Sequence, residues 1–158
     1  MSAIVGNRRS AWPIWAARVA VALVCAWNLS AAIPFTLAPA RYAPAFEVSD
    51  VGGEALVRGM GILFLMWQVP FLPVIWDPRR HRACFRVILA MQAIGLAGEA
   101  CMLATLAPGH AVLHATGMRF VAFDAAGLAL LAASYALARR EPVAPESQGV
   151  RRRLALHS

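Results

Sequence analysis

The sequence contains no lysine, few acidic residues and few cysteines, and it lacks several motifs that mark known kinds of binding site. Fifteen arginines stand against eight acidic residues, which gives a net charge of +7. The three cysteines, Cys25, Cys84 and Cys101, form no C-x-x-C pair. Their spacing fits neither a zinc site nor a redox dithiol, so we expect them to pack as small apolar side chains. The nucleotide-binding motifs G-x-G-x-x-G and the P-loop are also absent.

The arginines do not predict a nucleic-acid-binding protein. Most of them lie at the ends of apolar segments, which is the pattern that orients a chain in a membrane rather than the pattern of a phosphate-binding face. No known nucleic-acid-binding module matches the sequence. We therefore expect no nucleic-acid partner.

Apolar residues are abundant instead. They make up 60% of the 158 residues, and the mean hydropathy is +0.61, whereas a soluble domain is about 45–50% apolar. The excess falls in four blocks, each long enough to give the roughly 30 Å of helix that crosses a bilayer. The sequence thus predicts an all-α, membrane-embedded four-helix bundle over residues 14–138. Its spans are about 14–33, 54–76, 83–107 and 111–138, between a tail at 1–13 and a basic, disordered tail at 139–158.

Prolines mark two interruptions. Three of them in residues 34–53 prevent one continuous helix there, which leaves two interpretations, an interfacial turn lying on the bilayer or an ordered surface loop. Pro70 and Pro73 fall in the last third of the second span. They are expected to kink it and to free the carbonyls of Met66 and Val69.

The distribution of arginine predicts the orientation. With four spans, Arg8, Arg9, the turn at 79–82 and the C-terminal tail share one side of the membrane, and Arg41 is alone on the other. Cytoplasmic loops carry the excess of positive charge. We therefore expect a multi-pass protein of a bacterial-type plasma membrane with both termini in the cytoplasm.

The first span also resembles a signal peptide, because it has a basic start and small residues at its end. Its apolar stretch, however, is about 20 residues long, whereas the apolar region of a signal peptide has 7–15. This length favours an uncleaved span.

Arg18 and Arg86 lie one turn inside their spans and can reach the head groups, and Glu54 lies at a span end. Four further charged residues lie inside the predicted spans: Arg58, Glu99, Arg119 and Asp124. A charge in the hydrocarbon region costs about 2.5–3.5 kcal/mol, so each requires a partner or water. At 1.5 Å per residue, the first three fall about 6–12 Å below the outer surface and Asp124 about 19 Å below it. Glu99 is therefore expected to bridge Arg58 and Arg119. Asp124 lies about 140° round the helix from Arg119 and needs another partner.

Other polar residues fall in the same half of the predicted bundle. The full candidate set is Glu54, Arg58, Glu99, Arg119, Asp124, Asn28, Gln92 and His114. Two interpretations stay open: an ionic clasp that fixes which helices meet, or an outward-opening pocket. In the pocket, the arginines would hold an anionic or carbonyl-bearing ligand and the acids would exchange protons.

The sequence predicts no metal and no catalytic residue. His110 and His114 are four residues apart, a spacing that can hold a metal, but only Glu54 lies at a matching depth as a third ligand. The serines have no base at a matching depth, which argues against a hydrolase triad.

Three segments resemble small bacterial four-span proteins of the DoxX-like group and neighbouring families of unknown function. They are Ile33-Pro34-Phe35, Leu56-Val57-Arg58-Gly59-Met60-Gly61 and Asp77-Pro78-Arg79-Arg80-His81-Arg82. The resemblance implies a four-helix membrane fold and, by analogy only, a quinone as ligand. The chain is also similar in span count to small multidrug transporters, but those rely on a glutamate in the first span and this one has no acid there.

Three functions remain as hypotheses. The first is a non-enzymatic membrane protein, either an accessory subunit of a larger complex or a binder of a small amphipathic ligand at the polar cluster. The second is a quinone-linked membrane oxidoreductase component, and the third is a proton-coupled transporter acting as a homodimer. No cofactor is expected apart from the quinone suggested by analogy.

Overall fold

Helices dominate the structure, a computed structural model that describes residues 12–139. Four helical segments are long and apolar enough to cross a membrane: Trp12–Leu37, Asp50–Trp76, Arg82–Ala104 and Ala111–Arg139. The prediction of an all-α bundle with four spans is therefore confirmed. The predicted tails at 1–13 and 139–158 lie almost entirely outside the described residues.

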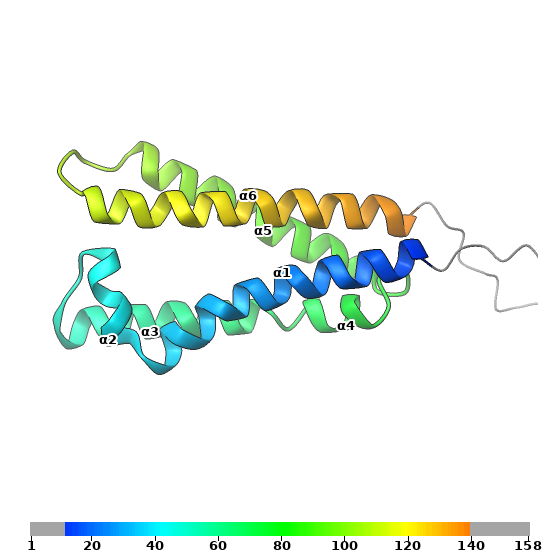
Figure 1. Ribbon diagram of the computed structural model, residues 1–158, viewed down its shortest axis with the longest axis horizontal. Helices are drawn as coiled ribbons and strands as arrows, with labels where there is room; N and C mark the ends of the chain where they lie inside the picture. Colours follow the sequence, from blue (N-terminus) through cyan, green and yellow to red (C-terminus); the bar gives the residue numbers. More distant parts are fainter. Residues whose placement is uncertain (1–11, 140–158) are drawn as a thin grey trace, which may run out of the picture.

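The spans form a bundle in which α1 occupies a central position (Figure 1). The elements are α1 (Trp12–Leu37), α2 (Pro39–Tyr42), the 3-10 turn η1 (Ala43–Phe46), α3 (Asp50–Trp67), α4 (Phe71–Trp76), α5 (Arg82–Ala104) and α6 (Ala111–Arg139). Helix α1 packs against α3, α4 and α6, while α5 packs against α6 and α4. We call the end of the bundle where α1 begins and α6 finishes the terminal end, and the opposite end, which carries α2 and η1, the distal end (Figure 1).

The first helix is longer than predicted, because it continues through Pro34 to Leu37. A proline inside a helix has no N–H to donate, and its ring crowds the carbonyl four residues earlier. The helix nevertheless continues past Pro34, and Ala38 N donates to the Pro34 carbonyl at 2.8 Å. The segment that follows folds into α2 and η1, which pack on α3 and α6. Residues 34–53 therefore form ordered helical turns against the bundle.

The second span is divided at residues 68–70, where the two prolines were expected to kink it. The two freed carbonyls accept hydrogen bonds from residues three positions later. Val69 N donates to Met66 O at 3.2 Å, and Leu72 N donates to Val69 O at 3.3 Å. The break thus leaves these backbone groups satisfied and lets α4 pack against α5 at the terminal end.

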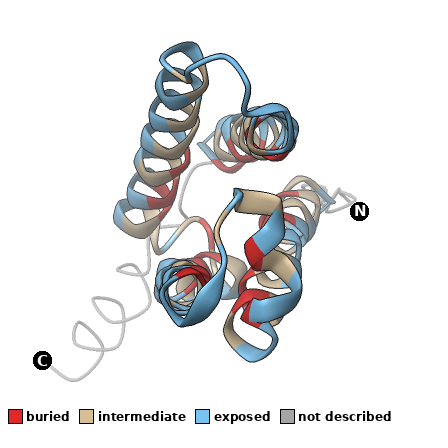
Figure 2. Cartoon of the chain, turned by 90° about the vertical axis from the view of Figure 1, so that its left-hand side faces the viewer, coloured by how far each residue is buried: buried red, intermediate tan, exposed pale blue. Residues whose placement is uncertain are grey.

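Two clusters of buried side chains hold the bundle. The terminal cluster includes Val21, Phe71, Phe85, Ile88 and Leu131, and the distal cluster is built on Phe35, Ala43 and Val57. Apolar side chains also cover much of the outside of the bundle, where Figure 2 shows exposed residues on the outward faces of the helices. Val19, Leu23, Leu63 and Met66 are each more than half exposed, as expected of side chains that face lipid.

Arg18 joins α1 to the end of α4 at the terminal end of the bundle. Its Nε donates to the carbonyl of Ile75 in the last turn of α4 at 2.8 Å, and its guanidinium lies 4.4 Å from the centre of the Trp15 ring. Carbonyls of a last helical turn have no partner within the helix. The arginine that opens the first span is thus held by a backbone acceptor.

Candidate functional site

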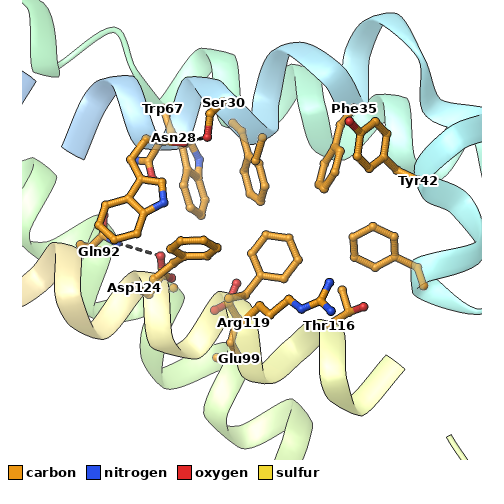
Figure 3. A pocket seen from close by; sticks show the side chains of 18 of the residues that line it. Asn28, Ser30, Phe35, Tyr42, Trp67, Gln92, Glu99, Thr116, Arg119 and Asp124 are labelled. Atoms are coloured by element: carbon orange, nitrogen blue, oxygen red, sulfur yellow. Dashed lines mark hydrogen bonds between the residues drawn. The ribbon is translucent and has the colours of Figure 1, made fainter. Parts of the chain in front are cut away.

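A cavity of about 560 Å³ lies in the distal half of the bundle, between the pair α1 and α3 and the pair α5 and α6 (Figure 3). Residues of α2 and η1 also contribute to its wall. Its volume is within the range of about 300–1,000 Å³ that is typical of small-molecule sites.

Aromatic rings form most of the distal wall. Phe35 lies at the centre of this group, and its ring centroid is 5.1 Å from that of Tyr42, 5.6 Å from Phe46 and 6.3 Å from both Phe64 and Phe120. These separations are those of favourable tilted and edge-to-face pairs. The rings come from α1, α2, η1, α3 and α6, so the wall depends on the whole bundle being assembled.

Polar side chains gather toward the other end of the cavity, where Figure 3 shows Asn28 on the α1 side and Gln92 and Asp124 on the α5–α6 side. Gln92 Nε2 donates to Asp124 Oδ1 at 2.7 Å. The carboxyl group of Glu99 lies near that of Asp124. We refer to Asn28, Gln92, Glu99 and Asp124 as the polar end.

Glycines allow the polar end to form. Gln92, Gly95 and Glu99 lie on one face of α5 because they are three and four residues apart. A Cβ atom at position 95 would lie 2.7 Å from Asp124 Oδ2, and one at position 127 would lie 3.0 Å from Gln92 Nε2. Without side chains at these two positions, α5 and α6 come close enough for the amide to reach the carboxylate.

Two acceptor atoms at the cavity lack hydrogen-bond partners among residues 12–139. Gln68 lines the cavity and is 94% buried, since its exposed fraction is 6%. Its Nε2 donates to the Phe64 carbonyl at 2.9 Å, which fixes the amide, but its Oε1 is buried with no donor. Glu99 Oε2 is buried and unpaired in the same way.

Five of the eight candidate residues line the cavity, and three do not. Asn28, Gln92, Glu99, Arg119 and Asp124 are part of its wall. Glu54, Arg58 and His114 lie outside it, and both Arg58 and His114 are exposed.

The expected bridge from Glu99 to two arginines does not form. Across residues 12–139, no ion pair joins Arg58 or Arg119 to a carboxylate. Arg58 follows Val57, which is buried together with Gly61 on the face of α3 that packs on α1, and a step of about 100° turns the arginine away from that face. The guanidinium of Arg119 points toward Thr116 and away from Asp124 (Figure 3). Glu99 has Asp124 as its neighbour instead.

A second polar contact closes the distal end. Glu47 Oε1 accepts a hydrogen bond from Leu113 N at 3.0 Å, in the first turn of α6, and its Oε2 lies 2.6 Å from His110 Nδ1. Glu47 follows η1 and has a φ of 53°, in the left-handed region. This contact ties the α1–α3 half of the bundle to α6. His110, considered above as half of a metal pair, is therefore the partner of a carboxylate.

Replacing Glu47 with glutamine is expected to remove an acid-sensitive part of the protein's stability. The hydrogen bonds from Leu113 and His110 lower the pKa of Glu47 from its ordinary value of 4.5. The charged form is thus favoured in the folded protein, so the contribution is complete above pH 4.5 and is lost as the pH falls through the lowered pKa. Melting temperatures between pH 3 and 6 should fall less steeply for Glu47→Gln than for the unaltered protein, and parallel curves would contradict the contact.

Sequence reasoning missed the aromatic wall and Gln68. Phe35, Phe64 and Phe120 look like ordinary apolar residues of a span, and no spacing in one helix reveals that three helices bring them together. Gln68 did carry a signal, because it is a polar residue within the second predicted span, two positions before Pro70.

Comparisons with protein-family models, curated proteins and solved structures find no match to this chain. By the length and composition of its helices, it is a multi-pass membrane protein of the all-α class.

Proposed function

We propose that this membrane protein binds a small amphipathic ligand in the distal cavity. The observation that carries the proposal is a cavity of about 560 Å³ with aromatic rings along one part of its wall and uncompensated polar groups at the other. Ligand sites are mostly apolar with a few convergent polar groups. An ionic clasp alone would be expected to pair its charges and leave no such space.

Binding does not require an enzyme activity, and we favour a non-enzymatic role, as a carrier of the ligand or as an accessory subunit that holds it for a larger membrane complex. Within the described residues, no group of three metal-ligating side chains lies together. Native mass spectrometry of the gently solubilised full chain tests the proposal. It should detect a retained small molecule together with any partner subunit or second copy of the chain. A chain that retains no small molecule and binds no added probe would overturn the proposal.

We further propose that the cavity opens toward the outside of a bacterial-type plasma membrane. The arginine-rich turn at 77–82 and both ends of the described chain lie at the terminal end, whereas the distal end carries Arg41 (Figure 1). The positive-inside rule then supports cytoplasmic termini. A green fluorescent protein fused to the C-terminus should fluoresce, and a periplasmic alkaline phosphatase at the same position should be inactive. The opposite pair of results would reverse the orientation.

A further inference from the structure

Resting on the proposed function, we propose that the ligand is an amphipathic amine that binds as an organic cation, with its N–H groups at the polar end of the cavity and its apolar body against the aromatic rings. This assignment concerns the chemical class of the ligand. It rests on which polar atoms lack partners, on the charges at the polar end and on the rings beside it.

The unpaired atoms at the cavity are acceptors. Gln68 Oε1 and Glu99 Oε2 are both buried without a donor from the part of the chain that the structure describes. Turning the Gln68 amide over would not resolve this, because its oxygen would then face the Phe64 carbonyl that its Nε2 now contacts at 2.9 Å. A buried acceptor without a donor is costly. The group that would satisfy these atoms is one that donates hydrogen bonds, as an ammonium does.

The two carboxyl groups at the polar end also favour a positively charged ligand. Glu99 and Asp124 lie next to each other, and their described neighbour is the neutral amide of Gln92. Arg119 also belongs to the wall, but its guanidinium points toward Thr116 (Figure 3). A ligand cation would supply the opposite charge that residues 12–139 do not place there, and charge-assisted hydrogen bonds are about twice as strong as neutral ones.

Aromatic rings complete the argument. Trp27 and Trp67 line the cavity together with Phe123. Trp67 lies near Asp124, because a Cβ atom at position 95 would be 2.7 Å from Asp124 Oδ2 and 4.0 Å from the Trp67 ring. Trp27 and Phe123 form an edge-to-face pair with centroids 4.7 Å apart. Ring faces attract cations, and tryptophan does so most strongly. A quinone fits the unpaired oxygens of Gln68 and Glu99 less well, because its carbonyl groups cannot donate hydrogen bonds to them.

Three probes with one apolar body and different heads test the assignment: 4-phenylbutylamine, 4-phenylbutan-1-ol and 4-phenylbutanoate. We expect calorimetric titration of the detergent-solubilised full chain to show the amine binding at least about tenfold more tightly than the alcohol, with the carboxylate weakest. Glu99→Gln and Asp124→Asn should each remove most of this preference. Both substitutions keep the size of the side chain, and the amide oxygen introduced by Asp124→Asn can still accept from Gln92, so loss of folding is not expected. Glu54→Gln, which alters an acid outside the cavity, is the matched control and should leave the preference unchanged.

The possible results separate the two proposals. If the carboxylate binds best and Arg119→Ala weakens it, the ligand is an anion; the amine assignment is wrong and the proposed function stands. Equal binding of all three probes, or a preference for the amine that survives both acid substitutions, also overturns the assignment. If none of the probes binds, the assignment fails, and the proposed function fails with it only when native mass spectrometry also finds no retained small molecule.

Discussion

Phenylalanine in place of Gly98 is expected to displace the ligand from the cavity while the bundle stays folded. Gly98 lines the cavity, and a Cβ atom added there meets no atom within 4 Å. The new ring therefore has room to occupy the space that we assign to the ligand. We expect the affinity of any bound molecule to fall at least about tenfold, which corresponds to about 1.4 kcal/mol. Native mass spectrometry and titration with 4-phenylbutylamine both measure this change.

Gly59→Phe is the matched control for this experiment. Gly59 also has open space around its Cα atom and lies within a spanning helix, but it does not line the cavity. Both substitutions remove a helical glycine and should raise helix propensity by a similar amount, about 0.5 kcal/mol. If the two variants lose binding equally, or neither does, the cavity is not the binding site.

Alanine in place of Gly61 is expected to cause a large loss of stability, although it adds only one methyl group. A Cβ atom at this position would lie 2.6 Å from Thr36 N and 2.9 Å from Ala32 O, both of which are backbone atoms of α1. No rotation of a side chain relieves these contacts, so α1 and α3 must separate. Overpacking of this kind costs about 1–3 kcal/mol, and thermal unfolding in a fixed detergent should show a correspondingly lower midpoint.

Gly59→Ala provides the comparison here as well. It lies two residues away on the same helix and faces open space, so it should gain about 1 kcal/mol from helix propensity. Unfolding midpoints that move in the same direction for both variants would show that α1 and α3 do not approach each other at Gly61.

The positions of the spans were predictable because each is a long apolar block, and the prolines at 70 and 73 indicated where the second span divides. Pairing between charges was not predictable in the same way. Depth along the membrane normal placed Arg58 beside Glu99, but depth says nothing about rotation, and α3 presents Val57 and Gly61 to α1 instead of Arg58. The resemblance to DoxX-like proteins, which rests on short segments, remains a prediction.

The glycines also show that the rotation of a helix about its axis was not predictable from the sequence. From the sequence, Gly59 and Gly61 are equally good candidates for a close approach between helices. In the structure, of these two only Gly61 lies against a neighbouring helix. Gly95 and Gly98 differ in the same manner, since Asp124 lies against the first and open space against the second. Which glycine is required for packing depends on how each helix is rotated about its own axis. This rotation could not be predicted from the sequence alone.

The contact between Arg18 and the Ile75 carbonyl has a consequence for how this chain can vary. A chain with fifteen arginines and eight acidic residues cannot give every arginine a carboxylate of its own, and for Arg18 a carbonyl at the end of a helix is the acceptor instead. Every residue type at position 75 carries the same carbonyl oxygen. Substitutions at position 75 therefore keep the hydrogen-bond acceptor of Arg18, whereas changes that shift the end of α4 move it. We expect mutations of Pro73 and Asp77, rather than of Ile75, to weaken the contact of this arginine.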